Sequence, residues 1–213
     1  MICFYNFTKY NKSMLYIVRH GQTDWNLADR VQGHYDISLN NTGRAQAHQV
    51  AAKIEPFNIE HIVSSDLMRA RETAQIIGDK LHISVGYDAR LSEYDFGKLT
   101  GWKRGEIDPS MVQVFFSNPS KFGAERLEDA FTRVGNFLKD VDFNKNTLVV
   151  THGGVINFVL CYLEDKNNFY PASYLDKCLN VHIDNSAVLR IKNLKSEMGI
   201  LKNTRFFRLP KLR

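Results

Sequence analysis

The fold is indicated by the stretch LYIVRHGQT, residues 15–23. Leu15 to Val18 are apolar and mostly β-favouring, and a polar group beginning with Arg19 and His20 follows them directly. A buried parallel strand has such an unbroken apolar run and ends in a loop. The stretch therefore predicts a first strand whose carboxyl end carries Arg19 and His20.

Apolar strands and amphipathic helices alternate along the rest of the chain. Residues 40–42 can cap a helix whose apolar or small positions recur up to Ile54, and Pro56 follows its end. Ile59–Ser64 has the pattern of a second strand, and Asp66 is the expected N-cap of the next helix. The alternation predicts an α/β fold, a three-layer α/β/α sandwich with a mostly parallel central sheet that binds ligands at the carboxyl ends of its strands. Further predicted elements are extended segments at 82–85, near 181, at 187–191 and at 201–207, helices at 111–116, 127–140 and 155–163, and a strand at 147–151.

Chain length and composition favour a single domain. The 213 residues, 44% hydrophobic and 24% charged, suffice for one substantial core. Because Met14 directly precedes the first strand, we expect residues 1–13 to be a dispensable N-terminal extension and residues 14–213 to form the domain. The segment around 102–123, which contains Pro109 and Pro119, most resembles an insertion that covers the site.

Composition also bears on location and partners. No apolar stretch approaches the roughly 20 residues of a membrane span, and residues 1–13 lack the features of a secretory signal. The three cysteines, Cys3, Cys161 and Cys178, are widely spaced, which fits a reducing compartment and argues against a zinc site. The net charge of +5 suits small anions, and the basic residues are scattered except near the C-terminus. We therefore expect a cytoplasmic protein without a membrane or nucleic-acid partner.

Two histidines occupy equivalent positions in the predicted sheet. His20 and His152 each follow an apolar strand and precede a glycine, so both should project at the carboxyl edge. Either one alone would more often be an ordinary turn residue. Arg19 beside His20 favours function, because a guanidinium at a strand end needs a partner and phosphate offers a bidentate one.

Two further segments carry candidate groups, each with a structural alternative. Residues 64–74 place Arg69 in the first turn of a helix, where the alternative is a solvated cationic face. Arg71 is excluded because residues two apart do not share a helix face. Residues 91–97 set Glu93 among apolar residues, as suits a general acid, although backbone amides would hold a purely structural carboxylate there. Trp25 is expected to pack near the pocket mouth or to form an aromatic wall, and His34 to have a surface or packing role.

These motifs resemble those of the histidine phosphatase superfamily, which includes the cofactor-dependent phosphoglycerate mutases. The resemblance covers most of the chain from Leu15 to about Ile191, in the family's order. It implies a phosphoglycerate mutase-like fold and a small phosphorylated metabolite as partner, with no metal or other cofactor, and it leaves a homodimer open. The matching segments are RHGQTDWN at 19–26, QGHYD at 32–36, and residues 39–43, 65–74, 91–101 and 151–154.

The resemblance also implies a role for each matching residue. His20 is the nucleophile, Glu93 is the general acid, and Arg19, Arg69 and a protonated His152 clamp the phosphoryl oxygens. Such positive charge complements a phosphoryl group in transfer. Neutral His20 attacks through one ring nitrogen, and a backbone carbonyl is the expected acceptor for the other. The residues implied to line the phosphate and substrate side are Gly21, Gln22, Thr23, Asn26, Gln32, Gly33 and Gly153.

Departures from the mutase pattern favour the phosphatases of the family. The chain has no Arg-Arg pair, only a short stretch separates Glu93 from His152, and Phe96 stands where mutases tend to have tyrosine. Thr100 and Arg126 replace a frequent glutamate and serine, which indicates an unusual leaving-group pocket. A phosphoglycerate mutase that depends on 2,3-bisphosphoglycerate is the second hypothesis. A non-catalytic phosphate- or nucleic-acid-binding module that uses the basic run 202–213 is a distant third, because it leaves the strand-end histidines unexplained.

Overall fold

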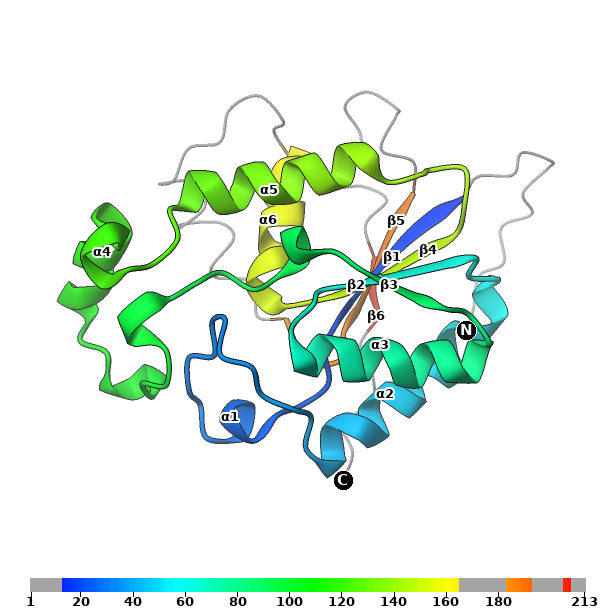
Figure 1. Ribbon diagram of the computed structural model, residues 1–213, viewed down its shortest axis with the longest axis horizontal. Helices are drawn as coiled ribbons and strands as arrows, with labels where there is room; N and C mark the ends of the chain where they lie inside the picture. Colours follow the sequence, from blue (N-terminus) through cyan, green and yellow to red (C-terminus); the bar gives the residue numbers. More distant parts are fainter. Residues whose placement is uncertain (1–12, 165–182, 193–204, 208–213) are drawn as a thin grey trace.

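A computed structural model describes residues 13–164, 183–192 and 205–207 of the chain. It contains a six-stranded sheet between two layers of helices (Figure 1). The strand order is β3-β2-β4-β1-β5-β6, in which the first four strands are parallel, β5 is antiparallel to β1, and β6 is antiparallel to β5. The predicted sandwich with a mostly parallel sheet is confirmed. The strands are β1 (Met14–Arg19), β2 (His61–Ser64), β3 (Val85–Tyr87), β4 (Thr147–Thr151), β5 (Val188–Lys192) and β6 (Arg205–Phe207).

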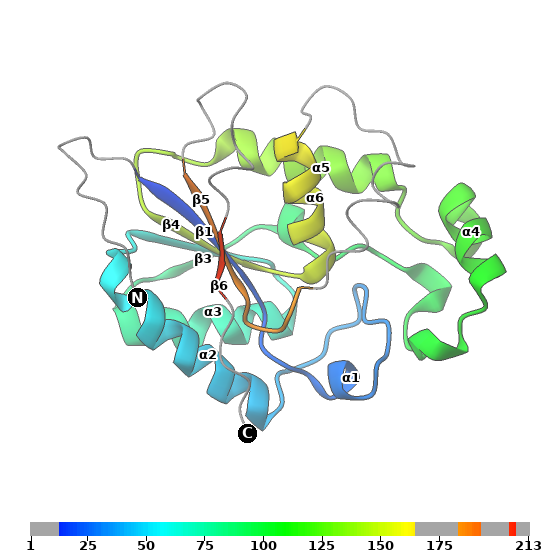
Figure 2. The same cartoon turned by 180° about the vertical axis from the view of Figure 1, so that it is seen from behind.

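Both faces of the sheet are buried, which explains the unbroken apolar strands. Because side chains alternate along a strand, Leu15 and Ile17 of β1 face one core and Tyr16 and Val18 face the other. The first core lies under α5 (Leu127–Asp140) and α6 (Gly153–Glu164), and the second lies under α2 (Asn41–Ile54) and α3 (Met68–Leu81) (Figures 1 and 2). The two cores hold the sheet from both sides.

The register of β1 against β4 places the functional edge. The strands run parallel with Arg19 opposite Thr151, and the His20 backbone N–H donates to the Thr151 carbonyl over 2.9 Å. The next residue on each strand is therefore a histidine at the same edge, as the sequence predicts for His20 and His152.

The remaining described elements are one helix of nine residues, a shorter helix and several short turns. An aromatic cluster forms around Phe115 of helix α4 (Pro109–Ser117), with ring centroids 6.2 Å from Tyr94, 6.0 Å from Phe96 and 5.3 Å from Phe122. The cluster fixes the segment around 102–123, which lies at one end of the molecule in Figure 1, against the loop that follows Glu93. The elements are α1 (Asp24–Leu27), α4 (Pro109–Ser117) and the 3₁₀ turns η1 (Glu55–Phe57), η2 (Ala89–Leu91), η3 (Gly97–Leu99), η4 (Arg104–Glu106) and η5 (Pro119–Phe122).

Two local predictions were wrong. Asp66 does not cap α3, because the N-cap is Leu67 and the Met68 N–H donates instead to Asp36 Oδ1 over 2.6 Å. The extended segment expected at 82–85 begins only at Val85, since His82 ends α3 in the left-handed conformation with φ 58°. In each case a contact or a helix end overrides the local pattern.

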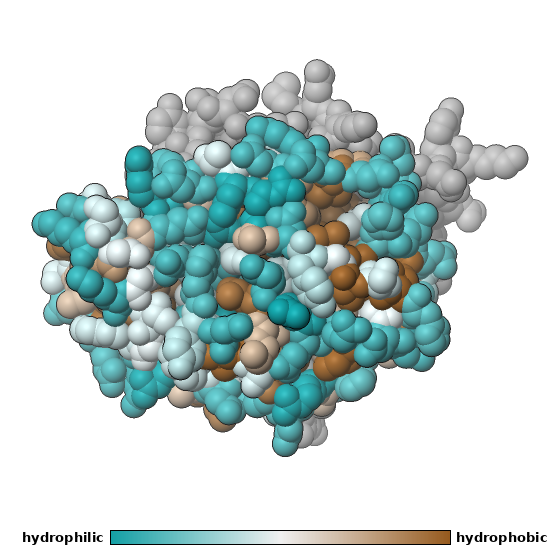
Figure 3. Space-filling model, viewed as in Figure 1, coloured by the Kyte–Doolittle hydropathy of each residue, from teal (hydrophilic) through white to brown (hydrophobic). Residues whose placement is uncertain are grey.

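Some predictions lie outside the described residues. These concern the N-terminal extension up to residue 12, the extended segment near 181, most of 201–207 and the basic run at the C-terminus. Within the described ranges, no helix has the length and apolar character needed to cross a membrane. Cys161 is disulfide-bonded, which the expectation of reduced cysteines did not anticipate. The face in Figure 3 is mainly hydrophilic, with hydrophobic side chains in separate groups.

Candidate active site

The turn after β1 is pressed against the start of α2. A Cβ on Gly21 would lie 2.4 Å from the carbonyl oxygen of Gly43, so backbone meets backbone directly. The Gly21 N–H donates to Thr73 Oγ1 over 3.0 Å, which ties the turn to α3 as well. Glycine at both positions permits this approach, and the approach fixes the position of His20.

His20 is buried and held in one tautomer. Its Nδ1 lies 2.7 Å from the Gly21 carbonyl oxygen, so Nδ1 carries the proton and donates it. This carbonyl is the backbone acceptor that the sequence analysis expected, and Nε2 keeps its lone pair. Burial lowers the pKa of His20 well below its usual 6.5, and the charges of Arg69 and Arg19 lower it further. A neutral imidazole with a free Nε2 is a competent nucleophile.

His152 lies beside His20, with ring centroids 5.2 Å apart. Its Nε2 is 2.8 Å from Ser65 Oγ, which already accepts the Leu67 N–H over 3.2 Å. We assign the one Ser65 hydroxyl hydrogen to Nε2, the ring acceptor within hydrogen-bond distance of it, and this assignment places the imidazole proton on Nδ1. Burial first, then Arg69 and His20, lower the pKa of His152 well below 6.5. In the unliganded protein the ring is therefore neutral and can donate through Nδ1. A protonated His152 beside a phosphoryl group in transfer stays a prediction.

Two arginines converge on this pair of histidines. Arg69 is only 1% exposed, and it donates to the carbonyls of Tyr35 over 2.9 Å and of Gly33 over 2.8 Å. Burial lowers the pKa of Arg69 to about 10, so it remains charged at neutral pH. Arg19 donates to the Ile183 carbonyl.

Three nitrogens of this cluster are buried without a partner among the described residues: Arg19 Nε, Arg69 Nε and His152 Nδ1. Buried polar groups are normally hydrogen-bonded, so a set of unpaired donors needs an acceptor. An oxyanion such as phosphate supplies several acceptors at once.

Glu93 follows η2 and faces the first turn of α6. Its Oε1 accepts the Tyr94 N–H over 3.0 Å, and its Oε2 accepts the Gly154 N–H over 3.4 Å. A Cβ on Gly154 would lie 2.4 Å from Oε1, so this glycine admits the carboxylate to the helix start. Backbone amides do hold Glu93, as the structural alternative supposed, yet the residue also lines a cavity together with Arg19.

That cavity measures about 650 Å³. Of the residues predicted for the site, it is lined by Arg19, Glu93, Asn26 and Gly153. His20, Arg69 and His152 are buried and do not line it, so Arg19 belongs both to the cavity and to the buried cluster. The other lining residues are Trp25, Asp29, Arg30, Tyr94, Phe96, Arg104, Phe116, Leu127, Gly154, Asn157, Ile183, Asp184 and Asn185.

Four residues predicted to line the phosphate and substrate side lie outside this cavity, and their contact with phosphate stays a prediction. Thr23 caps α1 through a reciprocal pair of bonds with Asn26, and the Gln22 N–H donates to Gln46 over 2.8 Å. Gly33 offers its carbonyl to Arg69, and Gln32 is buried.

Other residues at the site were not anticipated. Asn185 donates through Nδ2 to the His20 carbonyl over 3.1 Å and to Asn26 Oδ1 over 3.2 Å, yet no sequence motif marks it. Trp25, for which the sequence left two roles open, stacks on Tyr35 with centroids 4.8 Å apart and lines the cavity. Its use as a wall for an organic leaving group stays a prediction. In the described part of the chain, no group of three or more His, Cys, Asp or Glu side chains is placed to hold a metal ion.

Comparison with known proteins agrees with this geometry. A family model described as the histidine phosphatase superfamily (branch 1) matches residues 15–190. Over 152 residues the chain is 39% identical to phosphoglycerate mutase-like protein 4 of Arabidopsis thaliana, covering 66% of this chain and 66% of that protein. Over 147 residues it is 35% identical to the uncharacterized phosphatase PhoE of Bacillus subtilis, covering 68% of this chain and 74% of the relative. A mycobacterial glucosyl-3-phosphoglycerate phosphatase complexed with VO3 matches with a TM-score of 0.72 and 27% identity, covering 84% and 90% of the two chains.

Proposed function

Because this chain belongs to the histidine phosphatase superfamily, we propose that it hydrolyses a small phosphomonoester through a phosphohistidine on His20. The observation that carries the proposal is the set of buried donors without a partner among the described residues, Arg19 Nε, Arg69 Nε and His152 Nδ1. They belong to a ring 5.2 Å from that of His20 and to two guanidiniums whose charges act on it. The His20 imidazole is neutral, with its proton on Nδ1 and its lone pair on Nε2. This arrangement suits the transfer of a phosphoryl group, whose charge is spread over three equatorial oxygens.

In the first step, His20 Nε2 attacks phosphorus while the bond from phosphorus to the ester oxygen breaks. Glu93, in its acid form, donates a proton to the departing oxygen, and the product alcohol leaves through the cavity. The guanidiniums of Arg19 and Arg69 and the Nδ1–H of His152 bind the equatorial oxygens. Because these donors are already in place, little reorganisation is needed in the transition state.

In the second step, water attacks the phosphohistidine. The Glu93 carboxylate accepts a proton from this water, the bond between His20 Nε2 and phosphorus breaks, and inorganic phosphate is released. His20 returns to its neutral form, with Nδ1 still donating to the Gly21 carbonyl. The protein's own cations neutralise the phosphoryl charge at every stage, so the proposed reaction is independent of metal ions and of other cofactors.

The proposal extends to substrate class and location. A cavity of about 650 Å³ is within the usual range for small ligands, and its aromatic wall suits an organic leaving group. The mycobacterial structural neighbour is named for a small phosphorylated substrate, which supports the same class here. We keep a cytoplasmic location without nucleic-acid or membrane partners as part of the proposal, although the Cys161 disulfide counts against a reducing compartment. A homodimer stays untested.

The test is replacement of the proposed nucleophile. We expect His20→Ala to abolish hydrolysis of phosphorylated metabolites, because removing the nucleophile deletes the covalent route. Brief incubation of the wild type with substrate, followed by rapid quenching, should trap acid-labile, base-stable phosphate on His20. His48→Ala, which changes an exposed histidine of α2, is the matched control and should retain activity. Full activity of His20→Ala, or loss of wild-type activity in EDTA, contradicts the mechanism.

A phosphoglycerate mutase is the second candidate, favoured by the name of the Arabidopsis relative. A mutase must hold a second anionic group beside the transferred phosphoryl group. The two further arginines that line the cavity already have partners: Arg30 donates to the Gly101 carbonyl over 2.6 Å, and Arg104 pairs with Asp29 at 3.6 Å. We therefore place hydrolysis ahead of mutase activity.

A further inference from the structure

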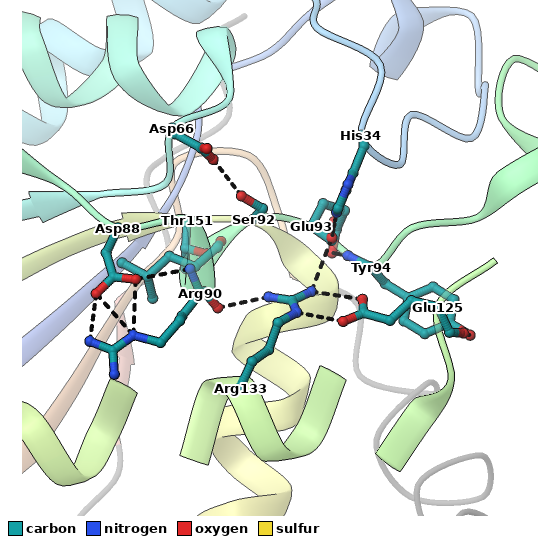
Figure 4. Close-up of polar contacts among 11 residues, drawn as sticks. His34, Asp66, Asp88, Arg90, Ser92, Glu93, Tyr94, Glu125, Arg133 and Thr151 are labelled. Atoms are coloured by element: carbon teal, nitrogen blue, oxygen red, sulfur yellow. Dashed lines mark hydrogen bonds and ion pairs between the residues drawn. The ribbon is translucent and has the colours of Figure 1, made fainter. Parts of the chain in front are cut away.

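Arg133 connects helix α5 to the loop that carries Glu93. Its guanidinium forms a bidentate pair with Glu125, with Nε 2.6 Å from Oε1 and Nη2 3.0 Å from Oε2. The remaining donors reach the loop, where Nη1 donates to the Arg90 carbonyl over 2.7 Å and Nη2 to the Glu93 carbonyl over 3.1 Å (Figure 4). One planar group thus fixes two carbonyls three residues apart in the chain.

The pair is largely shielded from water. The side chains of Arg133 and Glu125 are 18% and 15% exposed, and the Tyr94 hydroxyl donates to the Glu125 carbonyl. Shielding removes much of the solvent screening that weakens surface ion pairs. The rigid fork of arginine also holds its acceptors in a fixed plane, which a lysine ammonium cannot do.

The same loop has other attachments, which hold it from different sides. His34 contacts the loop from the exposed surface, with Nε2 2.6 Å from the Glu93 carbonyl oxygen. The Ser92 hydroxyl donates to Asp66 (Figure 4). His34 is exposed, as expected, yet it contacts the candidate acid, which the sequence analysis did not foresee. Arg133 differs from His34 and Ser92 because it binds the carbonyls at both ends of this turn, those of Arg90 and Glu93. The backbone of Glu93 therefore has its direction set from α5, while its carboxylate reaches α6.

We propose that Arg133, oriented by Glu125, is a positioning residue that aims the Glu93 carboxyl group at the departing ester oxygen. Its hydrogen bonds to the described residues go to Glu125 and to the Arg90 and Glu93 carbonyls, and none goes to His20, Arg19, Arg69 or His152. The inference rests on the proposed function, in which Glu93 supplies the proton for the leaving group.

The consequence is a dependence on the leaving group. An alkoxide needs protonation in the transition state, whereas p-nitrophenolate leaves almost unaided. General acid catalysis contributes typically about 10²–10⁴-fold, and a misplacement of about 1 Å can remove about 10²-fold. We expect Arg133→Gln to lower kcat/KM about 10- to 100-fold for an alkyl phosphate such as glycerol phosphate, and less than about threefold for p-nitrophenyl phosphate.

The experiment measures kcat/KM for both substrates on each preparation of the full chain. Because kcat/KM reports the steps up to phosphorylation of His20, hydrolysis of the phosphoenzyme does not affect it. The ratio of the two values is also independent of the folded fraction, so a poorly folding variant still gives an answer. Arg133→Lys keeps the charge but cannot bridge the two carbonyls, and it should show the same selective loss. Arg71→Gln, which removes an exposed guanidinium lying 4.9 Å from the Tyr87 ring centroid, is the matched control and should leave the ratio unchanged.

Glu93→Gln is the reference variant and separates two kinds of failure. If Glu93→Gln shows the selective loss and Arg133→Gln slows both substrates equally or neither, Arg133 has no positioning role and only this inference is overturned. If Arg133→Lys restores the wild-type ratio, charge and not geometry is responsible, which also overturns it. If Glu93→Gln itself lacks selectivity, the acid assignment in the proposed function is wrong, and the inference is overturned with it.

Discussion

Lowering the pH should decrease the free energy of unfolding of this protein, and the lowered pKa values of its two buried histidines set the size of the decrease. His20 and His152 are both neutral in the folded state, where burial and the neighbouring arginines lower the pKa of each well below 6.5. In the unfolded chain both regain an ordinary pKa and bind protons as the pH falls. The unfolded state then binds more protons than the folded state, so the free energy of unfolding decreases. The stability is fully present above the unfolded pKa of 6.5 and is lost as the pH falls below that value toward the folded pKa.

The size of the effect follows from proton linkage. One such histidine lowers the free energy of unfolding by about 1.4 kcal/mol between about pH 7.5 and about pH 5.5, provided that it stays neutral in the folded state. Both together give about 2.7 kcal/mol, a large part of the about 5–15 kcal/mol that stabilises a typical domain.

Urea unfolding at the two pH values measures this loss. Phosphate must be absent from the buffer, because an anion bound to the arginines would stabilise the folded state. The double variant His20→Gln, His152→Gln lacks both titrating groups and should lose about 2.7 kcal/mol less than the wild type over the same interval. His48→Gln, at an exposed position, should behave like the wild type. A double variant that loses as much stability as the wild type would refute the neutral state assigned to these histidines.

Two further predictions concern the turn after β1 and the fate of the phosphoenzyme. Gly21→Ala places a Cβ 2.4–2.9 Å from backbone atoms of Gly43, where no side chain can move aside, so it should cost at least about 2 kcal/mol in urea unfolding and lower kcat/KM at least tenfold. Gly86→Ala, whose Cβ would meet its nearest neighbour at 3.7 Å, is the control, and equal stability of the two variants would contradict the steric argument. With 3-phosphoglycerate and 2,3-bisphosphoglycerate supplied, we expect release of inorganic phosphate to exceed interconversion of 3- and 2-phosphoglycerate. A mutase rate above the phosphatase rate on the same preparation would reverse the order of the two candidate functions.

The sequence by itself was sufficient to predict the α/β sandwich and to place the two histidines at the carboxyl edge of its sheet. Strands buried on both faces leave unbroken apolar runs, and parallel strands end at a common edge, so the residues after β1 and β4 had to lie at the same edge. That the two strands are neighbours is decided by the tertiary structure. The helix over Leu127–Asp140 and the strand over Thr147–Thr151 have the predicted bounds for the same reason, since local periodicity matches their burial. Motifs near strand ends then pointed to Arg19 and Arg69.

Only the tertiary structure decided the contacts and charge states that depend on distant residues. The Met68 N–H at the start of α3 donates to Asp36 and not to Asp66, because the loop that carries Asp36, 32 residues earlier in the chain, lies against this helix end. Asn185 reaches the His20 carbonyl from 165 residues away, and no local pattern encodes that distance. His152 is neutral because the packed structure excludes water and places cations beside it, whereas the sequence shows only a histidine before a glycine. Desolvation and long-range hydrogen bonds arise when separate segments pack together, so they are properties of the fold and not of the local sequence.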